Sequence, residues 1–142
     1  MTVILTSRDI NSTIDKLWNI ISNVDKDPEY WYGTRSVKNI KKEGNIIERE
    51  TTISFKDYKC REIVTLNNKN QIIIKIVEGP VVGEKRITLE KIDENKTRIK
   101  VKWDIHMKGF MRLFTIFVKK HILKGTEEAI TRISNKAEEK ET

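Results

Sequence analysis

The chain has 142 residues, of which 37% are hydrophobic and 35% charged, so it can bury the core of one ordinary domain but is too short for two. Its longest apolar runs, such as residues 72–74, fall far short of the roughly 20 residues that cross a bilayer, and residues 1–9 lack the pattern of a secretion signal. We therefore expect a single cytoplasmic domain over residues 1–142, with residues 138–142 forming a frayed tail.

The net charge of +7 allows an anionic partner, such as nucleic acid, an acidic lipid surface or an acidic ligand. Basic and acidic residues alternate along most segments, which is typical of a solvated surface and argues against nucleic acid. The single cysteine, Cys60, excludes an internal disulfide, and His106 and His121 are too few for a zinc-type ligand set. We expect neither a metal nor a cofactor.

The first third of the chain predicts one strand followed by two short helices. Residues 3–9 alternate as a strand does, and Asn11 or Ser12 offers a side-chain oxygen to cap the next helix. Apolar residues then recur three and four apart over residues 13–21, which places them on one helical face. Asp27 and Pro28 interrupt this pattern, so a second short helix is expected before Gly33.

Residues 35–107 change to a period of two, which predicts about six consecutive antiparallel strands. Turn residues separate these strands at 44–45, 56–57, 67–70, 79–80 and 93–95. A sheet with one apolar face needs a cover, and the segment after Gly109 is the remaining element. Its apolar residues recur at helical spacing from Phe110 to Ile133, so one long helix is expected along the sheet.

Together these elements predict an α+β fold, in which a curved antiparallel sheet of about seven strands wraps around a long C-terminal helix. The order of elements resembles the START-like or SRPBCC superfamily, which has this helix-grip fold. The local features that carry the resemblance are residues 12–18 after the opening strand, residues 28–31 before Ser36 and Val37, and residues 96–98 before the last strand. The polyketide cyclase/lipid transport and coenzyme Q-binding branches are the most similar in length and layout. The resemblance implies an internal cavity, whereas the reaction or ligand varies within the superfamily.

The strongest candidate site lies on the third and fourth strands. A hairpin around Lys56 and Asp57 would place Phe55 opposite Tyr58 and Thr51 opposite Glu62, and make Arg49 a diagonal neighbour of Glu62. The inward face of this hairpin would also carry Ile47, Ile53, Val64 and Leu66. Arg49 could then bind a carboxylate, carbonyl or phosphate of a ligand, with Glu62 orienting it or acting as an acid or base. A bulge that turns both side chains to solvent, or an ordinary ion pair, explains the same residues.

Aromatic and apolar residues complete the predicted cavity. Its wall would be formed by Trp103, Met107, Phe110, Phe114 and Phe117, each of which is equally well explained as core. Its lid or mouth would be formed by Tyr30, Trp31 and Tyr32, which could instead plug the space between the short helices and the sheet. Gly125 interrupts the long helix, and we expect it to allow close packing rather than to make room for a ligand.

Three functions remain open from the sequence. The favoured one is a non-catalytic carrier or sensor of an apolar molecule such as a lipid, an isoprenoid quinone or a polyketide-like ring. The second is a cyclase or dehydratase that uses Arg49, Glu62 and Tyr58. The third is a basic surface module for nucleic acid or a partner protein. Arg112, Lys119, Lys120 and Lys124 would also suit transient contact with an anionic membrane, although a solvated helix face explains them too. The oligomeric state does not follow from the sequence.

Overall fold

A computed structural model describes residues 2–139 and has the predicted α+β architecture. Strand β1 (Thr2–Ile10) leads into helix α1 (Ile14–Ile21), the short 3-10 helix η1 (Val24–Lys26) and helix α2 (Asp27–Tyr30). Six strands follow: β2 (Thr34–Glu43), β3 (Ile46–Ile53), β4 (Lys59–Asn67), β5 (Gln71–Glu78), β6 (Val81–Asp93) and β7 (Lys96–Met107). A second 3-10 helix, η2 (Gly109–Phe114), and helix α3 (Thr115–Ala137) complete the fold.

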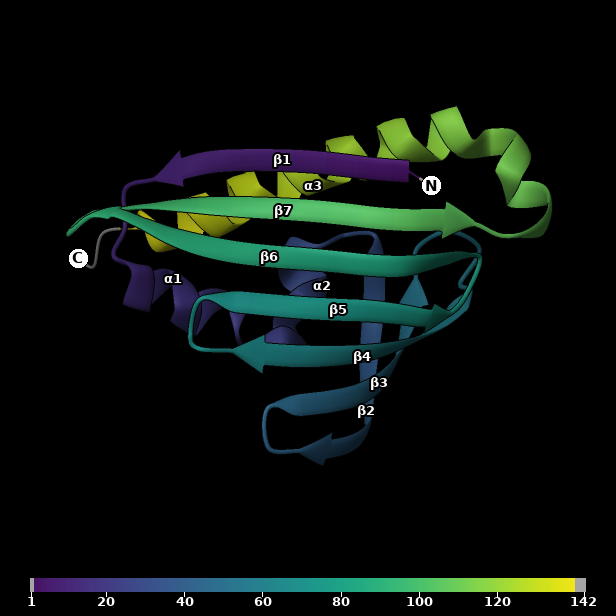
Figure 1. Cartoon of the computed structure of the whole chain (residues 1–142), viewed down its shortest axis with the longest axis horizontal. Coiled ribbons are helices and arrows are strands. Elements are labelled where there is room, and N and C mark those ends of the chain that lie inside the picture. The colour runs from purple at the N-terminus through teal and green to yellow at the C-terminus, as the bar shows by residue number, and fades with distance from the viewer. Residues whose placement is uncertain (1, 140–142) are drawn as a thin grey trace.

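The strands form one antiparallel sheet of seven strands in the order β1-β7-β6-β5-β4-β3-β2 (Figure 1). Every turn predicted between the strands is present. Two of these turns place non-glycine residues in the left-handed region, namely Lys56 and Asp57 in one and Asn68 and Lys69 in the other. Irregular register in the β2–β3, β4–β5 and β6–β7 pairs accompanies the curvature of the sheet. The sheet thereby encloses a core against the helices.

The cap of α1 differs from the expectation. The side chain of Thr13, not Asn11 or Ser12, accepts a hydrogen bond from the backbone N–H of Lys16, at 3.2 Å. Ser12 is buried, and its carbonyl accepts a hydrogen bond of 2.9 Å from the Thr97 hydroxyl on β7. The Ser12 hydroxyl donates to the Thr13 carbonyl at 3.2 Å, and because α1 begins at Ile14 the capping position falls on Thr13.

Helix α3 covers the sheet over only part of its length. Its buried residues are Thr126, Ala129, Ile130, Ile133, Ser134 and Ala137, all in the C-terminal half. The first turn is not α-helical as expected, since residues from Gly109 to Phe114 form the 3-10 helix η2. In Figure 1, η2 and the first turns of α3 extend past the N-terminal end of β1, and Leu113, Ile116 and Phe117 there are exposed. The expectation that the whole apolar stripe packs on the sheet is therefore wrong for Phe110, Leu113, Phe114 and Phe117, whereas Val118 and Ile122 are partly buried against the core that contains Ile4, Ile105 and Met107.

The C-terminal end of α3 is tied to the start of the chain. The backbone N–H of Glu138 donates to the carbonyl of Ser134, and its carboxylate accepts a hydrogen bond of 2.9 Å from the Asn11 N–H. Glu138 is therefore held in place, whereas residues 140–142 of the predicted frayed tail lie outside the described residues.

Gly125 does not serve close packing, contrary to the expectation. A Cβ atom built at this position would meet no heavy atom within 4 Å, and the residue is exposed on α3. Because glycine in a helix interior is destabilising by about 1 kcal/mol relative to alanine, Gly125→Ala should raise the free energy of unfolding by about that amount. Urea unfolding followed by circular dichroism would measure this gain, and a loss of stability would show that the backbone at Gly125 is not regular helix.

Candidate functional site

A polar cluster lies on the inner, concave face of the sheet, where β3 and β4 pair. Arg49 lies directly opposite Glu62, not diagonal to it as expected, and Thr51 lies opposite Cys60. The difference arises at the hairpin, where the Ile53 N–H donates to the Tyr58 carbonyl and residues 54–57 form a longer loop than predicted. Because the register changes by two residues, the side chains of β3 and β4 keep the faces that the sequence predicts, whereas Phe55 and Tyr58 lie outside the strands and are exposed.

Arg49 is the centre of this cluster and is only 2% exposed. Its Nε atom donates to Glu62 Oε1 at 2.9 Å, one terminal nitrogen to the Val24 carbonyl at 3.0 Å, and the other to Asp27 Oδ2 at 2.8 Å. All three nitrogens are therefore engaged by protein oxygens. Arg49 fastens η1 and α2 to the inner face of the sheet, and its predicted role towards a ligand remains a prediction.

Lys85 is a second buried cation, on β6, and has a different environment. Its side chain is 6% exposed and has no hydrogen bond or ion pair with any residue of the range 2–139. Its Nζ atom lies 3.0 Å from the centroid of the Trp31 ring and 4.9 Å from that of the Trp103 ring. The two indole rings stabilise the amine through cation–π contacts. They leave its hydrogen-bonding capacity unused.

The electrostatics of the cluster follow from its burial. Burial lowers the pKa of Lys85 from an ordinary value of 10.5 to about 7, although Asp27 and Glu62 act in the opposite direction. Burial also raises the pKa of Asp27, against the attraction of Arg49. Burial alone would lower the pKa of the Arg49 guanidinium, but the two carboxylates outweigh it and the pKa is raised.

Cys60 lies beside this cluster, opposite Thr51 on the paired strand. Burial, aided by the negative charge of Glu62, raises the pKa of its thiol to about 11. A thiol with this pKa is protonated at neutral pH and is a poor nucleophile. Cys60 is therefore a packing residue.

The remaining predicted wall residues divide between the core and the surface. Val64 and Met107 are buried, Trp103 and Ile53 are half-buried, and Phe55 and Tyr58 are exposed at the tip of the β3–β4 hairpin. Phe110, Phe114 and Phe117 are exposed on η2 and the first turn of α3. Their expected place in a cavity wall remains a prediction.

The three aromatic residues of the predicted lid differ in burial and in the residues that they contact. Trp31 is buried, with its ring 6.4 Å from that of Trp103, while Tyr32 is exposed and stacks on Arg132 of α3. Tyr30 is half-buried, and its carbonyl accepts a hydrogen bond of 2.8 Å from Arg132. Trp31 is thus the one member of the three that reaches the polar cluster.

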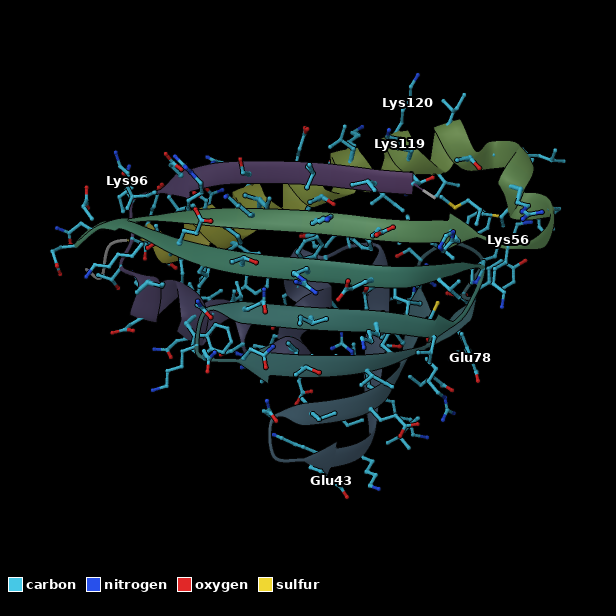
Figure 2. The ribbon with its side chains drawn as sticks, viewed as in Figure 1. Glu43, Lys56, Glu78, Lys96, Lys119 and Lys120 are labelled. Carbon is cyan, nitrogen blue, oxygen red and sulfur yellow. The ribbon has the colours of Figure 1, made fainter. Side chains whose placement is uncertain are left out.

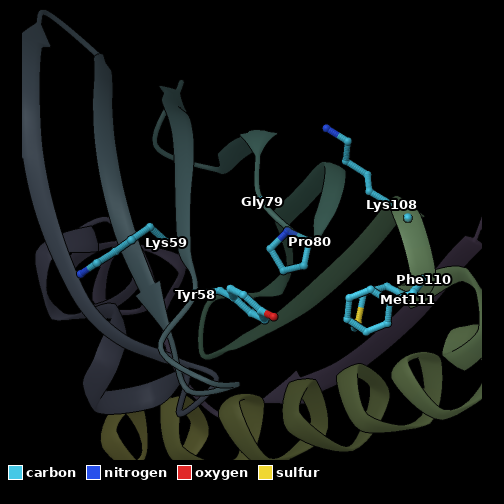
Figure 3. Close-up of a pocket in the computed structure, with 8 residues that line it drawn as sticks. Tyr58, Lys59, Gly79, Pro80, Lys108, Phe110 and Met111 are labelled. Atoms are coloured by element: carbon cyan, nitrogen blue, oxygen red, sulfur yellow. The ribbon is translucent and has the colours of Figure 1, made fainter.

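A pocket of about 360 Å³ opens at the end of the sheet where β7 leads into η2 (Figure 3). Its lining residues are Tyr58, Lys59, Gly79, Pro80, Lys108, Gly109, Phe110 and Met111. In Figure 3 the Tyr58, Pro80 and Phe110 rings lie around the pocket, while the ends of Lys59 and Lys108 point away from it. The pocket thus offers apolar surface at the rim of the domain.

Apolar side chains between this pocket and the polar cluster are incompletely covered. Ile76 and Trp103 pack against the main core, and Val81, Val118, Ile122 and Leu123 pack against a smaller core near the pocket, yet all six are only partly buried. On β6, Gly83 lies between Val81 and Lys85 with a positive φ, and a Cβ atom added there would meet the backbone of Asp104 and Ile105 on β7. The pocket itself does not reach Lys85. We infer that a ligand could extend from it over these side chains to Lys85, and we name this inferred binding region the groove.

Asp27 and Lys85 are site residues that the sequence analysis missed. Lys85 has the same parity on its strand as the buried Ile87 and Leu89, so the period of two could have found it. Asp27 carries no such signal, because it begins the four-residue helix α2, which is too short to show a period, and meets Arg49 only through the tertiary fold.

Two further properties concern the described residues as a whole. Within residues 2–139, no group of three or more histidine, cysteine, aspartate or glutamate side chains lies close enough to hold a metal ion. No helix in that range is long and apolar enough to cross a membrane.

Known structures share this fold. A protein from Thermus thermophilus superposes with a TM-score of 0.82 at 14% identity, over 96% of this chain and 97% of the other. A START superfamily protein from Mycobacterium smegmatis gives a TM-score of 0.77 at 14% identity, over 94% and 97% of the two chains. An aromatase/cyclase from Streptomyces gives 0.69 at 12% identity, over 94% and 86%. No protein-family model and no curated protein matches the sequence. The chain therefore has the START-like, helix-grip fold, shown by structure rather than by sequence.

Proposed function

We propose that the protein binds an apolar small molecule in the groove, with a carbonyl or carboxylate of that molecule accepting hydrogen bonds from Lys85. The observation that carries the proposal is the Lys85 side chain: the residue is only 6% exposed, its Nζ atom has no hydrogen-bond or ion-pair partner among the described residues, and that atom keeps some accessible surface. Because buried polar groups are rarely left unsatisfied, a ligand oxygen is a suitable partner for this amine. The rest of the ligand would lie on partly buried apolar side chains such as Trp103 and Ile122.

The similar structures support this proposal at a coarse level. They include a START superfamily protein and an aromatase/cyclase, which have the same fold. The fold itself accommodates many functions, so the chemistry must be tested on this chain.

A matched pair of probes tests the role of Lys85. Wild-type protein should bind oleic acid more tightly than methyl oleate. Lys85→Met should lose about tenfold or more in affinity for the acid and clearly less for the ester, because hydrogen bonds between charged groups contribute about 1.5–3 kcal/mol and those to a neutral carbonyl contribute less. Quenching of tryptophan fluorescence is a suitable readout, since Trp31 and Trp103 flank Lys85.

Lys75→Met is the matched control, because Lys75 is exposed on the neighbouring strand β5 and should not affect either probe. Equal loss of both probes in Lys85→Met would contradict the assigned contact. Native mass spectrometry of protein purified from its own source, followed by organic extraction, would identify the bound molecule. A tightly packed protein without any apolar molecule, unable to take up either probe, would contradict binding itself.

A second function is a cyclase-type reaction, and the pKa of about 7 for Lys85 favours it. An amine with this pKa exchanges a proton readily at neutral pH, as a general acid or base requires. Lys85 would then take the place of Tyr58 beside Arg49 and Glu62 as a residue of the reaction, since Tyr58 lies exposed at the rim of the pocket. Turnover of a poly-β-ketone by wild-type protein, absent in Lys85→Met, would distinguish the enzyme from the carrier.

A further inference from the structure

The segment that joins the sheet to α3 exposes several large apolar side chains. Leu113 is 84% exposed, Ile116 75% and Phe117 71%. Phe110 and Phe114 are also exposed and contact each other edge to face. We name these five residues the apolar tip. Soluble monomers rarely expose contiguous apolar clusters of this kind unless the cluster contacts a partner or a membrane.

Basic residues surround the apolar tip without any acidic counterpart. The sequence has no aspartate or glutamate between Asp104 and Glu127, although such residues alternate with basic ones elsewhere. The same interval contains five basic residues, which we name the basic collar: Lys108, Arg112, Lys119, Lys120 and Lys124. All five are exposed, and none forms an ion pair within the described part of the chain. Figure 2 shows Lys119 and Lys120 on the N-terminal half of α3, where the helix extends past β1.

We propose that the apolar tip and the basic collar together dock the protein on an anionic lipid bilayer. The tip would enter the interface between headgroups and acyl chains, and the collar would contact the anionic headgroups. A second copy of this chain fits less well, because two basic collars would face each other and repel.

The docking surface borders the mouth of the groove. Phe110 belongs to the apolar tip and also lines the pocket, together with Met111 and with Lys108 of the collar. Docking would therefore bring the mouth of the groove against the lipid surface, where an apolar molecule could enter without crossing water. The docking itself does not depend on the identity of any ligand.

Co-sedimentation with vesicles tests the proposal. The full chain should bind vesicles of equal parts phosphatidylglycerol and phosphatidylcholine about tenfold more tightly than vesicles of phosphatidylcholine alone, because each basic residue near the surface adds to the attraction. Lys119→Glu with Lys120→Glu should weaken this binding by about tenfold or more. Leu113→Ser with Phe117→Ser should weaken it by a similar factor through lost burial of apolar surface.

Matched controls distinguish this surface from the protein as a whole. Lys38→Glu with Lys42→Glu makes the same charge change on β2, at the opposite edge of the sheet, and Val3→Ser with Leu5→Ser removes exposed apolar residues on β1. Both controls should bind nearly as the wild type does. Equal weakening in test and control variants, or no binding of the wild type to anionic vesicles, would overturn the proposal. A dimer in analytical ultracentrifugation that Leu113→Ser with Phe117→Ser dissociates would also overturn it, in favour of a second copy.

Discussion

Replacing Arg49 with methionine is expected to lower the free energy of unfolding by about 3–5 kcal/mol. The substitution leaves the carboxylates of Asp27 and Glu62 buried without the cation that each contacts, at 2.8 Å and 2.9 Å respectively. It also frees the Val24 carbonyl, which accepts a hydrogen bond from Arg49. Breaking a buried ion pair from one side is costly because the remaining charge has neither water nor a partner. Urea unfolding at neutral pH would measure the change.

Arg61→Met is the matched control for this experiment. Arg61 lies on β4, beside Glu62, and forms an ion pair of 3.0 Å with Glu48 of β3, but both side chains are more than a third exposed. Water compensates most of the lost interaction there, so the expected change is within about 1 kcal/mol. Similar losses in the two variants would show that burial of the Arg49 cluster does not strengthen it.

The stability of the wild type relative to Lys85→Met is expected to rise with pH above about 7. The folded-state pKa of Lys85 is about 7, whereas the unfolded chain should titrate near the ordinary 10.5. Between these values the unfolded state binds more protons, so raising the pH favours the folded state by up to about 1.4 kcal/mol for each pH unit. Below pH 7 both states are protonated, and the cost of burying the charge is constant.

The measurement is a series of urea titrations of both proteins from pH 6 to pH 10. The free energy of unfolding of Lys85→Met is subtracted from that of the wild type at each pH. Groups that titrate in both proteins cancel in this difference, so its slope against pH reports the titration of Lys85. Lys75→Met supplies the control, because its exposed charge remains in water in both states. If the difference in free energy of unfolding between the wild type and Lys85→Met does not change from pH 6 to pH 10, Lys85 is charged in the folded protein, with a carboxylate or water as its partner.

The order of elements could be predicted from the sequence because it depends on local signals. Period-two alternation and turn residues delimit β2 to β7, and left-handed conformations at Lys56 and Asn68 occur where the turns were expected. The inward face of Arg49 and Glu62 also follows from parity alone, since a change of register by two residues keeps that face. The alternation of side chains along a strand also places Lys85 on the inward face, which it shares with Ile87.

Only the tertiary structure decided which side chains meet and which parts of a helix are covered. The spacing of Leu113 and Phe117 is the same whether or not a sheet lies beneath them, so their exposure depends on where the sheet ends. The contact of Asp27 with Arg49 joins residues 22 positions apart, and no local period encodes it. Sequence periodicity therefore determined the faces of the elements, while the length and curvature of the sheet determined their partners, because contacts between distant segments depend on how the elements pack.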